Sequence, residues 1–184
     1  MVTREQALQM VQKHVKNKNL IKHMLAVEAI MRSLAARFGE SVERWGLAGL
    51  LHDLDYDQTA NDPTNHSILA AAMLEDAGFD PDLVYAIKVH NEVHGLPRIS
   101  LMDKALYAAD PLSGLIVAAA LIHPDRKLAS IDVTFIMNRV REKSFARGVS
   151  REQLQSCSEL GLTLEQFINL GLRAMQGIST DLGM

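Results

Sequence analysis

Hydrophobic residues recur every three or four positions along most of the chain, which predicts amphipathic helices. The clearest case runs from residue 19 to 38, where Gly39 then ends the apolar stripe. The stripe consists of Leu20, Met24, Val27, Met31, Leu34 and Phe38. Similar patterns predict further helices at 3–16, 41–56, 62–78, 80–95, 100–122, 130–143, 150–160 and 163–178. No segment alternates with period two, so we expect an all-α fold of about nine helices.

Polar residues at the predicted helix starts support these boundaries. Thr3 begins a capping box, and similar boxes begin at Ser150 and Thr163. Asp62-Pro63 and Asp80-Pro81 match a capping aspartate followed by proline in the first turn. Pro111 lies inside the helix predicted at 100–122, where we expect a kink.

The bulk composition indicates one soluble domain over residues 1–184. The chain has 184 residues, 48% of them hydrophobic, and a net charge of -3. We expect a core at about 20–115, with C-terminal helices at about 125–180 packed on it. The negative charge argues against bulk nucleic acid as a partner. The sequence does not indicate an oligomeric state.

Two further features favour the cytoplasm. The single cysteine, Cys157, cannot form an internal disulfide, which suits a reducing compartment. The first 18 residues carry charges throughout and lack an apolar signal core. The apolar run Ala105–Ile122 contains Asp110 and Pro111, so a buried helix is expected there and no membrane span.

Histidines and aspartates stand at positions where burial would be costly without a partner. His23 shares a helix face with apolar residues, and His52-Asp53 ends the apolar stretch that begins at Ala48. Asp110 interrupts an apolar helix. A shared metal would satisfy all four side chains. Imidazole and carboxylate ligands suit Fe, Mn, Zn, Co or Ni.

The order His23, His52-Asp53, Asp110 resembles the H…HD…D motif of the HD superfamily of metal-dependent phosphohydrolases. The resemblance implies an all-α HD domain in which these four residues bind one metal. His66 and His90 resemble the additional histidines of the HDIG-type subgroup, whose members can hold two metals. A second ion would then use His66 and His90, with Asp53 bridging.

The chain departs from the subgroup pattern at two places. Leu54-Asp55 follows the HD pair where a glycine would be expected, and Asn91 stands where a second histidine often lies. The second metal could therefore have fewer protein ligands, with water completing the shell. His94 is interpreted as a helix-end histidine favoured by the helix dipole.

The function implied by these residues is hydrolysis of a phosphoester or phosphoanhydride bond in a nucleotide or another small phosphorylated molecule. One or two divalent ions would activate water, and Asp53 is the expected catalytic residue. Lys104 and Arg126 are candidates for binding a substrate phosphate. Two alternatives stay open: a di-iron oxygenase with similar ligands, and a nucleotide sensor without turnover.

Overall fold

The computed structural model describes residues 2–142 and 144–184, and within them the regular structure is helical without strands. The α-helices are α1 (Arg4–His14), α2 (Lys18–Phe38), α3 (Val42–Leu51), α4 (Tyr56–Thr59), α5 (Ile68–Asp76), α6 (Pro81–Val89), α7 (Leu101–Ile122), α8 (Val133–Arg141), α9 (Arg151–Gln155), α10 (Leu164–Gln176) and α11 (Ser179–Leu182). Short 3-10 helices lie at Glu92–His94, Leu128–Ser130 and Ser156–Leu160. The predicted all-α class is confirmed.

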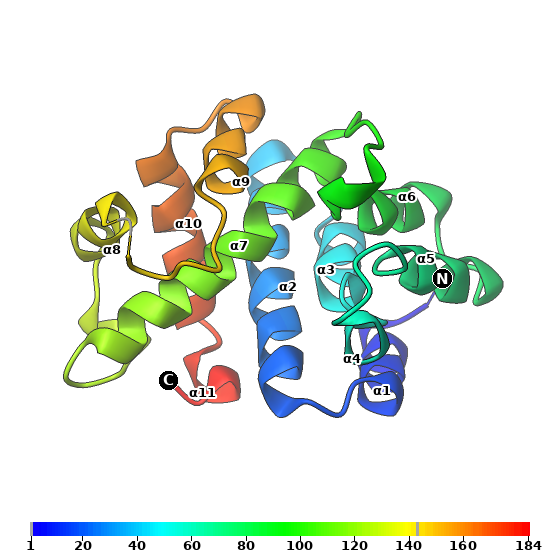
Figure 1. Ribbon diagram of the computed structural model, residues 1–184, viewed down its shortest axis with the longest axis horizontal. Coiled ribbons are helices and arrows are strands. Elements are labelled where there is room, and N and C mark those ends of the chain that lie inside the picture. Colours follow the sequence, from blue (N-terminus) through cyan, green and yellow to red (C-terminus); the bar gives the residue numbers. More distant parts are fainter. Residues whose placement is uncertain (1, 143) are drawn as a thin grey trace.

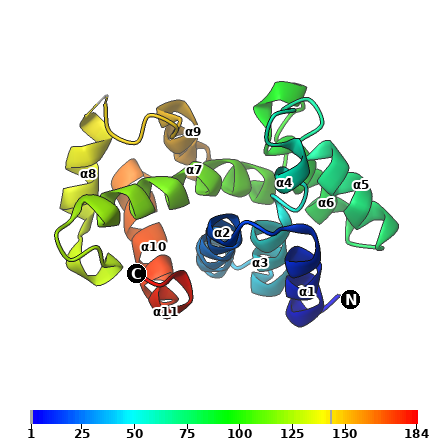
Figure 2. The ribbon, with the colours of Figure 1, turned by 60° about the horizontal axis from the view of Figure 1, so that its bottom comes forward.

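Two long helices organise the fold. α2 stands near the middle of the molecule and packs against α3, α7 and α10 (Figure 1). α7 crosses the molecule, with α6 near its start and α8 near its end (Figures 1 and 2). One continuous cluster of buried apolar side chains extends from α1 to α11. The C-terminal helices therefore share a core with the helices that carry the HD motif.

α7 is also the one helix in the described residues that is long and apolar enough to cross a membrane by length and composition. Its most apolar stretch has a mean hydropathy of 1.8, and 61% of that stretch is buried inside the fold. These features suit the central helix of a packed core. α7 continues without interruption through Pro111.

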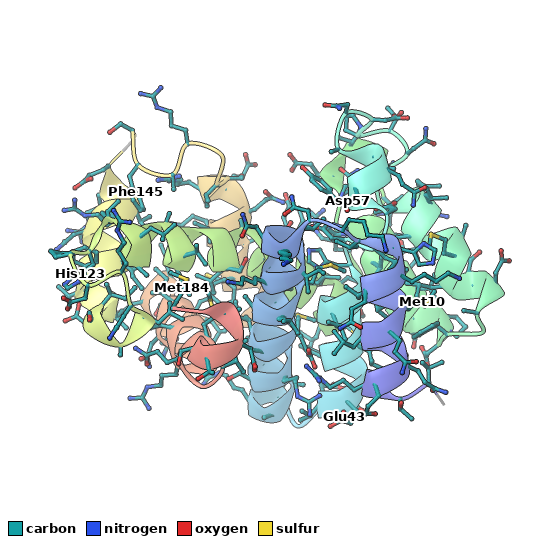
Figure 3. The ribbon with its side chains drawn as sticks, turned by 90° about the horizontal axis from the view of Figure 1, so that it is seen from below. Met10, Glu43, Asp57, His123, Phe145 and Met184 are labelled. Carbon is teal, nitrogen blue, oxygen red and sulfur yellow. The ribbon has the colours of Figure 1, made fainter. Side chains whose placement is uncertain are left out.

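A glycine sets the distance between α2 and α3, which lie side by side in the view from below (Figure 3). A Cβ atom at Gly49 would lie 2.8 Å from the carbonyl oxygen of Val27 and 2.9 Å from the Cα of Glu28. Both of these atoms belong to the backbone of α2, so only glycine permits the close approach. The approach brings His23 on α2 within reach of His52 at the end of α3.

Each of the nine predicted helices has a counterpart, but several boundaries differ. The helix predicted from residue 62 begins at Ile68, and residues 63–67 form turns. The Asp62 carboxylate accepts hydrogen bonds from the side chains of Thr64 and Asn65, so it closes a local turn and does not cap a helix. α6 ends at Val89, short of the predicted Gly95.

Other boundaries shift for similar local reasons. α3 ends at Leu51, so His52 and Asp53 lie in the turn that follows. The short α4 and α11 were not predicted. The predicted end of the helix at 130–143 falls on Lys143, which lies outside the described residues, and α8 itself ends at Arg141.

Candidate metal centre

The six residues expected to bind metal converge on the carboxylate of Asp53. His23 projects from α2, His52 and Asp53 follow α3, and Asp110 lies in the middle of α7. The Nε2 atoms of His23 and His52 each lie 3.5 Å from Asp53 Oδ2. Asp110 Oδ1 lies 3.2 Å from His23 Nε2 and 3.9 Å from His52 Nε2. These donors form the first half of the cluster, around Asp53 Oδ2.

The other oxygen of Asp53 faces a second pair of histidines. His66, in the turn before α5, places Nε2 3.5 Å from Asp53 Oδ1. His90, which caps the C-terminus of α6, places Nε2 3.7 Å from the same oxygen. The rings of His66 and His90 meet edge to face, with centroids 5.1 Å apart. The two carboxylate oxygens of Asp53 therefore face two separate groups of donors.

The hydrogen bonds behind the histidines fix their tautomers. His52 Nδ1 lies 2.9 Å from the Gly49 carbonyl, and His90 Nδ1 lies 2.6 Å from the Ile87 carbonyl, so both Nδ1 atoms are donors. His66 Nδ1 lies 2.9 Å from Asp55 Oδ1, which again requires a proton on Nδ1. Each neutral ring then turns the lone pair of Nε2 toward Asp53.

The same reasoning applies to His23 through Ser113. The Ser113 hydroxyl donates to the carbonyl of Asp110 at 3.0 Å, so its oxygen accepts from His23 Nδ1 at 2.8 Å. Metal-binding histidines generally donate their second N–H to such a partner.

The spacing of the donors fits a divalent transition metal. The Nε2 atoms of His23 and His52 are 3.1 Å apart, although both Nδ1 atoms already carry the donated hydrogen. Two bare lone pairs at this distance repel, so either a proton or a metal ion must lie between them. Adjacent ligands about 2.0–2.1 Å from one ion stand about 2.8–3.4 Å apart in octahedral or tetrahedral geometry. The observed separations of 3.1, 3.2 and 3.5 Å around His23 lie in or close to this range.

Charge favours a proton on His23 in the metal-free cluster. Burial lowers the pKa of His23, but the carboxylates of Asp110 and Asp53 outweigh it and raise that pKa to about 10. Burial lowers the pKa of His52 to about 4. Burial alone would raise the pKa of Asp53, yet the neighbouring histidines hold it well below its usual range. The proton on His23 thus supplies the positive charge that a metal ion would bring.

Asp55 orients His66. From the sequence, this residue is notable only as a departure from the family pattern. Its carboxylate is fully buried and accepts hydrogen bonds from the backbone amides of Ser67 at 2.8 Å and Ala70 at 2.9 Å, besides His66. Ser67 has a φ of 70°, an unusual conformation for a non-glycine residue. Asp55 thereby fixes the strained turn that presents His66.

Asn91 and His94 support the same turn from the opposite side. The Asn91 side-chain amide donates to the carbonyls of Pro63 and His66, and His94 Nε2 lies 2.8 Å from the His66 carbonyl. Asn91 therefore does not replace a histidine ligand. The interpretation of His94 as a dipole-stabilised residue misses this tertiary contact, which joins residues 28 positions apart.

The structure does not bring Lys104 or Arg126 to the cluster. Lys104 Nζ lies 3.6 Å from Glu159 Oε2. Arg126 follows the end of α7, and 12 residues of helix separate Asp110 from Ile122, about 18 Å along the axis. The cluster is open to solvent on the side of His23 and Asp110. Their side chains are 24% and 31% exposed, whereas the side chain of His52 is 0% exposed.

Comparisons with known proteins agree with this arrangement. The family model described as HD domain matches residues 20–120, more than half of the chain and all six of these side chains. Curated relatives include ribonuclease Y of Oleidesulfovibrio alaskensis, 31% identical over 100 residues, and of Geobacter sulfurreducens, 32% identical over 98 residues. Each match covers 53% of this chain and 18% of the relative. The chain thus corresponds to less than a fifth of these relatives, and no solved structure matches it.

Proposed function

Because the chain belongs to the HD domain family, we propose that it is a metal-dependent phosphohydrolase acting on a small phosphorylated molecule such as a nucleotide. His23, His52, Asp53 and Asp110 would hold one divalent ion. His66 and His90 would hold a second, with Asp53 bridging. The observation that carries the proposal is the division of the Asp53 carboxylate, with one oxygen facing each group of donors.

The donor set supports Fe, Mn, Zn, Co or Ni over Mg or Ca, because imidazoles supply four of the six side chains. When bound, such an ion would activate water as the nucleophile and neutralise charge on the phosphoryl oxygens. The second group offers two histidines and one carboxylate oxygen, so water would complete its shell.

The chain's own residues would set up the reaction by position and charge. Asp53 stays ionised because its pKa is held low, so it can bridge and orient a water molecule between the two groups. His52 and His90 are almost fully buried and keep their rings fixed through backbone carbonyls. The more exposed His23 and Asp110 mark the side at which the phosphate would enter. The single buried Cys157 fits a reducing, cytoplasmic setting.

The proposal is tested by phosphate release from a panel of nucleotides after chelation and reloading with Mn, Fe or Co. Activity should disappear with the chelator and return with metal. Asp53→Ala should lower metal binding and turnover by at least about a hundredfold. Asp76→Ala removes an exposed carboxylate on α5 and serves as the control. Inactivity of the metal-loaded protein on every phosphorylated substrate would contradict the proposal.

The same metal-loaded protein also distinguishes the two alternatives, a di-iron oxygenase and a nucleotide sensor. Oxygen consumption by the ferrous protein without phosphate release would indicate a di-iron oxygenase. Tight nucleotide binding without turnover would indicate a sensor.

A further inference from the structure

A groove of about 430 Å³ opens beside the candidate metal centre. It lies between the first turns of α2, the C-terminal half of α7 and residues 182–184 at the end of α11. Figures 1 and 2 show the C-terminus close to both helices, and Figure 3 labels Met184 there. The volume is within the range of small-molecule sites, about 300–1,000 Å³.

The groove borders the cluster at His23, the one proposed ligand that lines it, and at Ser113. Both residues line the groove, and both take part in the hydrogen bond that fixes the His23 tautomer. His23 and Asp110 are also the most exposed of the proposed ligands. A molecule whose phosphate reaches the cluster from this side would therefore leave its remaining part in the groove.

The walls of the groove combine an apolar surface with one cation. Val117, Leu121 and Leu182 form much of the apolar wall, and half of the Leu121 side chain is exposed to solvent. Lys22 is the only lysine or arginine among the described residues that line the groove. Its Nζ atom lies close to Gly183.

We infer that this groove binds the organic part of a nucleotide-sized substrate, and that Lys22 pairs with a negative charge of that substrate. The inference rests on the proposed function and narrows its substrate class to small phosphorylated molecules with an apolar or aromatic body. A polynucleotide would need several cations along its path, because phosphate contacts dominate such binding. The groove supplies one.

The test compares matched pairs of variants in steady-state hydrolysis by the metal-loaded protein. The probes are nucleoside 5′-monophosphates and 5′-diphosphates, glucose 6-phosphate and a 12-residue oligoribonucleotide. Lys22→Ala should raise KM for the nucleotides about tenfold, the size expected for one charged hydrogen bond, while kcat and bound metal stay unchanged. Lys13→Ala removes an exposed lysine of α1 as its control.

The apolar wall is tested by a pair of neighbouring residues. Leu121 and Ile122 are 53% and 51% exposed, but only Leu121 lines the groove. Leu121→Glu should raise KM for nucleotides at least about tenfold, and Ile122→Glu should leave it near the parental value. Glucose 6-phosphate should be a poorer substrate than the nucleotides, since its body is polar.

The outcomes separate the two proposals. Equal KM values for all four variants, or faster cleavage of the oligoribonucleotide than of any mononucleotide, would overturn the groove assignment and leave the phosphohydrolase intact. Absence of turnover with every probe would instead refute the proposed function. In that case, binding of a fluorescent nucleotide, weakened by Lys22→Ala and Leu121→Glu alone, would still support the groove, and unchanged binding would refute it.

Discussion

Replacing Asp55 by asparagine should remove one metal ion and spare the other. The carboxylate now accepts three hydrogen bonds: two backbone amides at 2.8 and 2.9 Å, and His66 Nδ1 at 2.9 Å. Asparagine keeps a single acceptor oxygen, which would stay with the two amides because they share Oδ2. Its amide nitrogen would then face His66 Nδ1 and favour the tautomer with the proton on Nε2. That proton would occupy the lone pair directed at Asp53.

The expected magnitude follows from this change of partner. Two of the three hydrogen bonds survive, so the loss of stability should be about 1–3 kcal/mol. Affinity for the second ion should fall by about 10- to 100-fold, as is usual when the residue behind a metal-binding histidine is changed. Affinity for the ion bound by His23, His52 and Asp110 should change little, because the hydrogen bonds of Asp55 go to His66, Ser67 and Ala70.

The assay is metal content by mass spectrometry after dialysis against a defined free-metal concentration, with circular dichroism to confirm folding. The parent should retain two ions and Asp55→Asn close to one. Asp57→Asn is the control, since the Asp57 carboxylate accepts hydrogen bonds from the backbone amides of Lys16 and Asn17. If Asp55→Asn binds both ions as tightly as the parent, the tautomer argument is wrong.

Four further predictions concern the first group of donors and the packing of the helices that carry them. Because the pKa of His23 is raised to about 10, a metal ion must displace the proton on His23 when it binds. The affinity for metal should therefore rise about tenfold per pH unit below 10. Calorimetry in two buffers measures the proton release. The same proton stabilises the folded metal-free protein, so its free energy of unfolding should fall as pH rises from 6.5 to 10. Metal affinity and stability that do not change with pH would contradict these two predictions. Ser113→Ala should weaken metal affinity about 10-fold without unfolding the protein, and an unchanged titration would exclude its role. Gly49→Ala should lower the free energy of unfolding by about 1–3 kcal/mol in urea, since its Cβ would meet backbone; an unchanged midpoint would refute the close approach.

The helices could be predicted from the sequence because their signals are local. The apolar stripe of α2 and its glycine stop gave boundaries within one residue of the structure. The boundaries near the site failed where tertiary contacts override local signals. The Asp62-Pro63 pair is a sound helix start in isolation, but the buried carboxylate of Asp55 captures the amides of Ser67 and Ala70 and moves the start to Ile68.

The candidate ligands could also be named from the sequence, because a histidine or carboxylate in an apolar helix is locally anomalous. The residues that form hydrogen bonds with these ligands could not be named from the sequence. Ser113 is an ordinary residue of an apolar helix until α2 places His23 against it, 90 positions away in the chain. The opposite error concerns Lys104 and Arg126, which were expected to bind phosphate because of their charge. Positive charge alone does not show which way a side chain points. Lys22, adjacent in sequence to His23, was overlooked because the groove exists only once α11 has folded back.

The most direct test of the central claim is the anomalous diffraction signal of the metal-loaded protein at the absorption edge of the bound element. The account predicts two peaks on either side of the Asp53 carboxylate, one among His23, His52 and Asp110, the other beside His66 and His90. No peak at Asp53, or peaks only at sites remote from it, would contradict the assignment of this cluster as the metal centre.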